Sequence, residues 1–287
     1  ATAAGSHEFD FGITAFEEMQ QEASFPFLST NLFEKGSSKP LLKPYIEKKT
    51  TNGIKVAIIG VTAKETEIIS KSGIEGKVAI TDPVKETAKA VEKVRKSNDI
   101  VILLSSLGLY DTEESFDGFP GDRKIANSVN GIDLIIGSRT KLHMEKPLEI
   151  KNTAIVQTEG YGKWIGRYDF FIENGKIVQK SYRTYEVKDK KENQAMKEML
   201  NNFKCEFSER VIGEAKTEFR AVASELRSKE SPIGNVIADI LREKTKAEIA
   251  FINSGSIRQG VKKGMVTEKD IFGLFPFMDT VIIGKIK

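Results

Sequence analysis

The chain has 287 residues, of which 39% are hydrophobic and 30% are charged, and its formal net charge at pH 7 is +3. This composition indicates a globular protein with one large or two ordinary domains. Lysines are interspersed with acids instead of forming a basic face, and no apolar run reaches the roughly 18 residues of a membrane-spanning helix, so we expect no nucleic-acid partner and no transmembrane segment.

Strands and helices alternate in the first part of the chain. The segment IKVAIIGVT is a short β-branched apolar run that predicts a buried strand. The helix that follows is expected to have Thr81 or Asp82 at its N-cap and Pro83 in its first turn. The strands are expected at 54–62, 99–108 and 132–138, and the helices within 81–97 and 121–131. This α/β order places ligand sites at the carboxyl ends of the strands.

The pattern changes further along the chain. Residues 154–187 alternate apolar and polar side chains and contain the turn ENGK, which predicts antiparallel strands. Residues 188–209 are polar and predict a linker helix. A second module starts near Arg210, with a helix expected at 231–245 and a buried strand at 247–253.

Both ends of the chain are unusual. It begins with ATAAGSHEF, without a methionine or a signal sequence, and it stops at VIIGKIK within an apolar stretch that predicts a strand. We therefore expect an internal segment of a longer protein, whose targeting peptide would lie outside this sequence.

Polar loops follow several strands, where the functional groups of an α/β fold gather. They are GSHEFDFG (5–12), LLSSLGLY (103–110), IIGSRTKLH (135–143) and FINSGSIRQG (251–260). With GIKVAIIGVT, VQTEGYGKWIGRYD, SPIGNVIADILR and GMVTEKDIFGLFPFMDTV, these motifs occur in the order of the 5'-nucleotidase and UDP-sugar hydrolase family, which the chain resembles over nearly its whole length. The resemblance implies a dinuclear metallophosphatase domain followed by a substrate-binding domain.

The resemblance also identifies four positions where the family binds metal. Ser6 replaces the Asn of Gly-Asn-His-Glu-Phe-Asp, and Ser106 replaces the His of Leu-Ser-His-Leu-Gly. Arg139 and Lys141 occupy the two His positions of Gly-Gly-His-Thr-His. A neutral hydroxyl coordinates divalent ions weakly, and two cationic side chains repel them. We therefore expect that the two divalent metal ions of active members are lost and that the chain has no cofactor.

His7 and Asp10 remain from the pair that, in the family, stabilises the phosphoryl transition state. General acid–base catalysis alone raises a reaction rate by about 10² to 10⁴-fold. This enhancement is too small for phosphate-monoester hydrolysis, because the uncatalysed reaction is among the slowest known. We expect a relic dyad that fixes the loop. Taken singly, the changes at Ser6 and Ser106 would also suit a working enzyme, and the family's remaining ligands are expected upstream of Ala1.

Arg139 and Lys141 allow two interpretations. They could bind a phosphate or an acidic side chain in place of the metals, since Arg offers a fork of donors and Lys a point charge. They could instead fill the vacated space by pairing with a nearby acid such as Asp10. We favour the second interpretation because buried charges require partners.

The second module preserves more of the family pattern. Arg227, Arg258 and Phe277 match positions that contact the nucleotide in the family, and Asp279 replaces an Asn that could donate to a base. Guanidinium groups suit phosphate oxygens, and a phenyl face suits a base. In the structural alternative, Phe277 is a core residue and Arg258 forms a salt bridge.

The resulting fold prediction is α/β (α+β): a four-layer metallophosphatase-type sandwich, incomplete at its N-terminus, over residues 1–187, then a linker helix over 188–209 and a smaller, truncated α/β C-terminal domain over 210–287. We predict a non-catalytic pseudoenzyme in the periplasm or at the cell surface that binds another envelope protein. The alternatives are an active metal-dependent 5'-nucleotidase, with ligands outside this chain, and a nucleoside- or nucleotide-binding protein.

Overall fold

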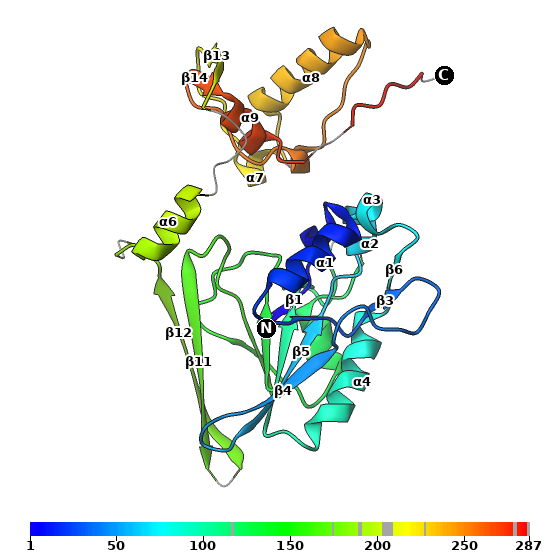
Figure 1. The fold of residues 1–287 in the computed structure, drawn as a ribbon, viewed down its shortest axis with the longest axis vertical. Helices are drawn as coiled ribbons and strands as arrows, with labels where there is room; N and C mark the ends of the chain where they lie inside the picture. The colour runs from blue at the N-terminus through cyan, green and yellow to red at the C-terminus, as the bar shows by residue number, and fades with distance from the viewer. Residues whose placement is uncertain are drawn as a thin grey trace. The chain divides into compact units, whose positions relative to one another are not determined.

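The structure is a computed structural model, shown as a ribbon in Figure 1. It describes residues 1–115, 118–173, 175–188, 191–202, 209–226, 228–277 and 280–285. The chain divides into two compact units, Ala1–Lys190 and Lys191–Lys287, and each is described by itself. The boundaries expected from the sequence, at 187 and 209, remain a prediction.

A six-stranded sheet forms the centre of the first unit, in the order β4-β5-β7-β8-β10-β9. The four inner strands are parallel, and the two outer strands, β4 and β9, run antiparallel to their neighbours. The strands are β4 (Tyr45–Lys49), β5 (Lys55–Val61), β7 (Ile100–Ser105), β8 (Leu134–Gly137), β9 (Leu148–Ile150) and β10 (Thr153–Val156). The three strands predicted around 54–62, 99–108 and 132–138 are confirmed.

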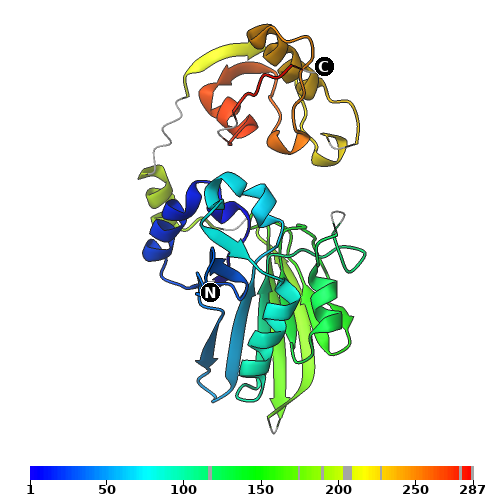
Figure 2. The same cartoon turned by 90° about the vertical axis from the view of Figure 1, so that its right-hand side faces the viewer.

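The two faces of this sheet have separate hydrophobic cores. Consecutive residues of β8 show the alternation, because Ile135 packs with the helices α4 (Pro83–Arg95) and α5 (Asp122–Ser128), whereas Leu134 packs with the hairpin on the opposite face. The hairpin consists of β11 (Trp164–Glu173) and β12 (Lys176–Glu186). Figures 1 and 2 show the resulting layers of helices, sheet and hairpin.

The α4 helix has the expected N-terminal signals. The Asp82 carboxylate accepts hydrogen bonds from the backbone N–H groups of Val84 and Lys85, at 2.9 and 3.1 Å, and Pro83 opens the first turn. Asp82, not Thr81, is therefore the N-cap, because its side chain satisfies two otherwise free donors of the first turn.

The hairpin confirms the antiparallel strands predicted within residues 154–187. The preceding strand, β10, does not fit that prediction. β10 pairs parallel with β8 and antiparallel with β9. All four of its residues are buried, as is typical of a strand covered on both faces. The alternation read from residue 154 onward was therefore wrong for 154–156.

A smaller layer is formed by segments that lie before β4 and after β5 in the chain. It contains the turn η1 (His7–Phe9), the helix α1 (Gly12–Glu22) and a core that includes Phe9 and Phe16. Its other elements are β1 (Thr2–Ala3), β2 (Phe27–Leu28), β3 (Leu32–Glu34), α2 (Thr66–Ile69), α3 (Lys71–Ile74) and β6 (Val78–Ile80).

The second unit is built around the helix α8 (Pro232–Thr245), which confirms the prediction for 231–245. Ile233 and Ile237 on α8 pack with Ile257, Val266 and Leu274. The other elements are α6 (Gln194–Asn202), β13 (Val211–Ala215), α7 (Ala223–Leu226), η2 (Ser254–Ser256), β14 (Gly264–Thr267) and α9 (Glu268–Leu274).

The strand predicted over 247–253 is wrong. The segment has no strand structure, and Ile249 and Phe251 are 63% and 83% exposed. A strand needs a neighbour to pair its backbone groups, and no described segment pairs with this one. In the part of the chain that the structure covers, no helix is long and apolar enough to cross a membrane.

Candidate functional site

The positions that the family resemblance assigns to metal ligands lie on loops at one edge of the central sheet. Ser106 directly follows β7, and Arg139 follows the neighbouring parallel strand β8. Ser6 precedes η1, and its side chain is joined to Arg139. The structure therefore brings these three positions together at the carboxyl ends of parallel strands, as the α/β order predicts.

Ser6 is buried and fully engaged in hydrogen bonding. Its Oγ lies 2.9 Å from Thr66 Oγ1 and accepts a hydrogen bond from Arg139 Nη1 at 3.2 Å. A second guanidinium nitrogen, Arg139 Nη2, forms an ion pair at 3.5 Å with Glu65, whose side chain is only 6% exposed. A buried acid thus pairs with Arg139, and this acid is Glu65, not the Asp10 suggested by the sequence.

Ser106 has a purely internal set of contacts. Its hydroxyl lies 3.2 Å from the carbonyl oxygens of Ala4 and Val61 and accepts a hydrogen bond from the Ala63 backbone N–H at 3.1 Å. The side chain is therefore tied to β5 and to the residue after β1.

The loop after β8 is conformationally strained. Arg139 and Lys141 both have positive φ, at 72° and 52°, a region that residues other than glycine rarely adopt. Lys141 points to a different partner from Arg139, because its Nζ donates to the Tyr161 hydroxyl at 2.8 Å and lies 4.4 Å from the centre of the Tyr161 ring. The two cations thus do not act on one acid.

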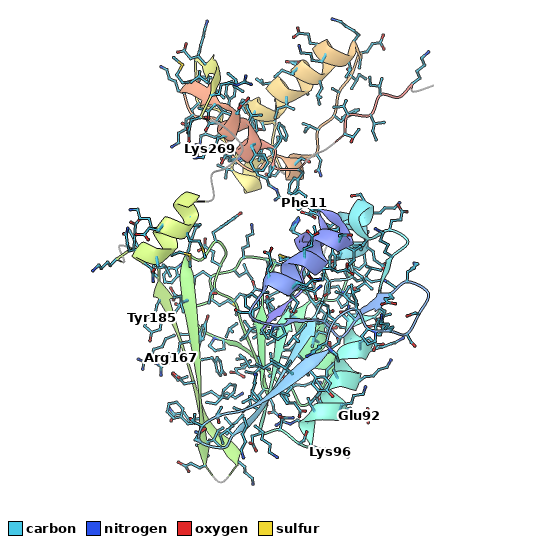
Figure 3. The ribbon with its side chains drawn as sticks, viewed as in Figure 1. Phe11, Glu92, Lys96, Arg167, Tyr185 and Lys269 are labelled. Atoms are coloured by element: carbon cyan, nitrogen blue, oxygen red, sulfur yellow. The ribbon has the colours of Figure 1, made fainter. Side chains whose placement is uncertain are left out.

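His7 and Asp10 do contact each other. His7 Nδ1 lies 2.8 Å from Asp10 Oδ2, and the His7 side chain is 58% exposed. The other carboxylate oxygen of Asp10 accepts a hydrogen bond from the Ser70 hydroxyl, which also donates to the Ser6 carbonyl. The next residue, Phe11, is 82% exposed (Figure 3).

Two further polar residues near these loops were not singled out in the sequence. Burial raises the pKa of Tyr110, and the nearby Arg139 guanidinium opposes this rise. Asp122, at the start of α5, is fully buried, and burial raises its pKa to about 7 although the Ser105 hydroxyl donates to it at 2.5 Å. No sequence motif distinguishes these residues from ordinary loop or helix positions.

His143 belongs to the packing of the first unit. Its ring stacks on Trp164 with the centroids 3.8 Å apart, and its Nε2 lies 3.2 Å from Thr184 Oγ1. Among the residues that the structure describes, no three or more His, Cys, Asp or Glu side chains gather as they would around a metal ion.

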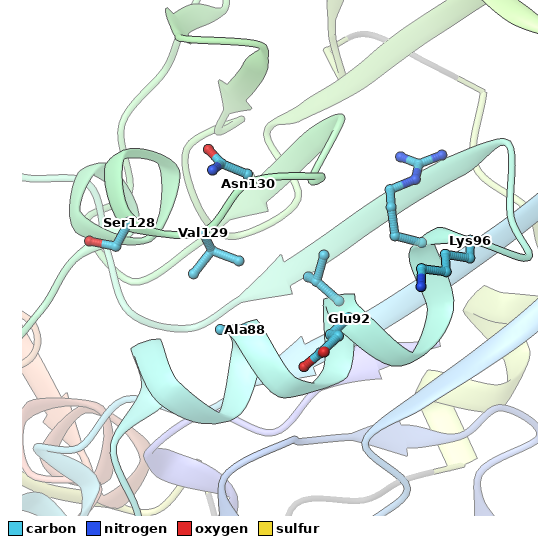
Figure 4. Close-up of a pocket in the computed structure, with 8 residues that line it drawn as sticks. Ala88, Glu92, Lys96, Ser128, Val129 and Asn130 are labelled. Carbon is cyan, nitrogen blue, oxygen red and sulfur yellow. The ribbon is translucent and has the colours of Figure 1, made fainter.

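A shallow depression lies away from these loops, between α4 and residues 128–130. It has a volume of about 300 Å³, and Figure 4 shows its lining residues. The Asn130 amide and the Glu92 carboxylate point in different directions in this view. These two polar groups therefore do not converge on a common ligand position.

In the second unit, two of the predicted nucleotide-contacting residues lie together. The Arg258 guanidinium carbon is 4.8 Å from the centre of the Phe277 ring, a cation–π geometry. Arg258 is exposed and Phe277 is partly buried. Arg227 and Asp279 lie outside the described residues.

Comparison with known proteins finds similarity to 5'-nucleotidases along the chain. Residues 211–287 match the family described as "5'-nucleotidase, C-terminal domain". The chain is 28% identical to a 5'-nucleotidase of Vibrio cholerae and 25% identical to the protein UshA of Escherichia coli, over 98% of its length in both cases. It spans 58% and 59% of those two relatives.

Solved structures of 5'-nucleotidases are also similar to this chain. A 5'-nucleotidase precursor from Thermus thermophilus has a TM-score of 0.81 and 27% sequence identity, over 96% of this chain and 57% of that one. The layered sheet and the strand-end loops define a calcineurin-like metallophosphatase fold followed by a nucleotidase C-terminal domain. The chain is therefore similar to 5'-nucleotidases over nearly its whole length, and residues 211–287 match the C-terminal domain of that family.

Proposed function

We propose that this chain is a non-catalytic member of the 5'-nucleotidase family and acts by binding. The observation that carries the proposal is the Arg139 guanidinium, which is hydrogen-bonded to Ser6 and paired with the buried Glu65. These contacts engage the Ser6 hydroxyl and the Glu65 carboxylate with a cation, so neither group is left to coordinate the two divalent ions of a two-metal site, whose usual spacing is about 3.5–4 Å.

The donor atoms at these positions also do not fit metal ions. Divalent metals that catalyse phosphoryl transfer are held by carboxylate, imidazole or amide ligands. Ser6 and Ser106 supply only neutral hydroxyls, and both hydroxyls already bond to protein groups. Without metals, the pair of the exposed His7 and the partly buried Asp10 has no means of activating water strongly enough for phosphate ester hydrolysis.

The first test measures metal content and catalysis together. Inductively coupled plasma mass spectrometry of the protein purified from its own cells is expected to find no stoichiometric divalent metal. Phosphate release from AMP, with added Mn²⁺, Mg²⁺ or Zn²⁺, is expected to stay at background, while the Vibrio cholerae 5'-nucleotidase assayed in parallel turns over. Two bound metal ions per chain, or efficient turnover, would instead support an active metal-dependent 5'-nucleotidase.

A second candidate function is nucleoside or nucleotide binding by the second unit. It is supported by the exposed Arg258 beside Phe277, which pairs a cation for phosphate with a ring for a base. Titration calorimetry with adenosine and AMP tests this function. Saturable heats that weaken in Arg258→Ala would support it, and no heat at millimolar ligand would exclude it.

We also propose an extracytoplasmic location, in the periplasm or at the cell surface, and a partner that is another envelope protein. Both proposals rest on the family resemblance. Fractionation of the native cells tests the location, and chemical cross-linking in intact cells followed by mass spectrometry tests the partner. Recovery with cytosolic markers alone would overturn the first proposal.

A further inference from the structure

A second and larger depression lies in the first unit, between the loop 35–44 and the helix α4. Its volume is about 510 Å³, within the range of about 300–1,000 Å³ that holds small ligands in proteins. Figure 1 shows its neighbouring elements β3, β4 and α4. The residues that carry the argument are Phe33, Ser38, Pro40, Tyr45, Lys89 and Lys93. None of them belongs to the loops of the former metal site.

One wall of this depression is anchored by hydrogen bonds. The backbone N–H of Glu34 donates to the Lys39 carbonyl at 3.0 Å, and that of Leu41 donates to the Leu32 carbonyl at 2.9 Å. The Ser37 hydroxyl accepts a further bond from the Lys39 N–H. The loop therefore has a fixed conformation around the depression, as small-molecule sites usually have before the ligand binds.

The other wall is the helix α4, which is held by its buried face. Ala90 and Val94 pack into the core of the first unit. Lys89 and Lys93 are one helical turn apart, so both lie on the side of α4 that faces the depression.

The charged side chains of α4 that line the depression include one lysine without an acidic partner among the described residues. Lys89 forms an ion pair with Glu86 at 2.8 Å. Lys93 forms no ion pair with any residue that the structure describes, and it is exposed. The net charge that α4 presents to the depression is therefore one positive charge, which matches a ligand with a single negative charge.

The rest of the lining combines aromatic and proline side chains with hydroxyl groups. Phe33 and Tyr45 are partly buried aromatic residues, and Pro40 adds a rigid apolar surface. Ser38 contributes a hydroxyl that can donate a hydrogen bond. The geometry points to a binding site for a small aromatic carboxylate, with its ring among Phe33, Pro40 and Tyr45 and its carboxylate toward Lys93.

Titration of the purified chain with sodium benzoate, followed by backbone amide chemical shifts, tests this site. Saturable shifts are expected at residues 37–40 and in α4, with a dissociation constant on the order of 1 mM for a ligand of this size. Lys93→Gln is expected to weaken binding about fivefold, the effect of one partly exposed charge pair. Lys96→Gln, which removes the same charge from the end of the same helix, is the matched control and is expected to bind as the native chain does.

Two other probes define the ligand chemistry. Benzyl alcohol has the ring without the charge and is expected to bind more weakly than benzoate, and phenyl phosphate, a dianion, is expected to bind no better than benzoate. Ser38→Trp fills the depression from an exposed position and is expected to abolish the shifts. The site is excluded if the benzoate shifts do not saturate or lie at other residues. It is also excluded if benzyl alcohol binds the native chain as tightly as benzoate does, or if Lys93→Gln binds benzoate as tightly as the native chain does.

Discussion

The Arg139 guanidinium donates a hydrogen bond to the Ser6 hydroxyl at 3.2 Å, although the two residues are 133 positions apart in the sequence. The family resemblance treats them as two separate replaced metal ligands. In the fold they are one arrangement, because the new cation bonds to the new hydroxyl and the buried Glu65 supplies the counter-charge. These contacts support the proposed loss of the metal site, because they join both positions and a buried acid in one arrangement.

Glu65→Gln tests the role of this counter-charge. The substitution keeps the shape of the side chain but leaves the Arg139 guanidinium without its acid, so we expect the free energy of unfolding of the first unit to fall by about 1–3 kcal/mol. Trp164, the single tryptophan of the sequence, lies in that unit, and its fluorescence during urea unfolding reports this transition.

Glu92→Gln is the matched control for Glu65→Gln. Glu92 is exposed on α4, and its replacement removes the same charge without breaking an ion pair of the described residues, so the expected change is within about 0.5 kcal/mol. Equal losses in the two variants would contradict the proposed role of Glu65.

His7→Ala tests whether the retained dyad is a relic. Its partner Asp10 lies 2.8 Å away, but the His7 side chain is largely exposed, so we expect a stability change below about 1 kcal/mol. Phosphate release from AMP is expected to stay at the background of the native chain. A tenfold decrease in metal-dependent release would instead identify His7 as catalytic.

The regular elements could be predicted from the sequence where their signals are local. β5, β7 and β8 are short apolar runs, and α4 has the Asp-Pro sequence that caps its first turn. The partner of a strand is not a local property. For this reason 154–156 joined a parallel pair, and 247–253 formed no strand at all.

In the candidate site, too, some features could be predicted from local sequence and others depend on the tertiary structure. The positions of Ser6, Ser106 and Arg139 could be located from motifs, because each follows a recognisable stretch of sequence. The acid that pairs with Arg139 could not, since Glu65 and Asp10 are both plausible in the sequence and only the tertiary structure brings Glu65 within 3.5 Å. The burial of Asp122 is likewise a tertiary property, because its carboxylate lies against Ser105, at the end of β7 and 17 residues away in the sequence.

Thr267→Ala tests the N-terminal cap of α9 in the second unit. The Thr267 hydroxyl accepts a hydrogen bond from the Asp270 N–H at 3.2 Å, and the Asp270 carboxylate accepts one from the Thr267 N–H at 2.9 Å, forming a capping box. Loss of this cap is expected to cost about 1 kcal/mol. Amide hydrogen exchange over 268–274 should therefore be about fivefold faster.

Thr267→Ser provides the control for the cap. Serine keeps the hydroxyl that accepts from Asp270, so exchange over 268–274 should remain close to the native rate. If the Ser and Ala variants exchange equally fast, the cap does not stabilise this helix.

The buried Asp122 predicts a specific pH dependence of the first unit. Burial raises its pKa from 3.8 to about 7 in the folded state. The folded chain therefore holds this proton more tightly than the unfolded chain, so the stability it contributes is present below pH 4 and is lost as the pH rises to about 7. The loss is expected to be about 4 kcal/mol, at about 1.4 kcal/mol per pH unit.

Asp122→Asn isolates this effect because the amide cannot ionise but can still accept the hydrogen bond from Ser105. Urea unfolding followed by Trp164 fluorescence should show little difference between the variant and the native chain near pH 4. The variant should become the more stable of the two as the pH rises to 7, and the difference should stay constant above that. Asp111→Asn, at an exposed position, should show no such trend. A native chain that is more stable than Asp122→Asn at pH 8 would mean that the Asp122 carboxylate is stabilised in its ionised form, contrary to the effect of its burial.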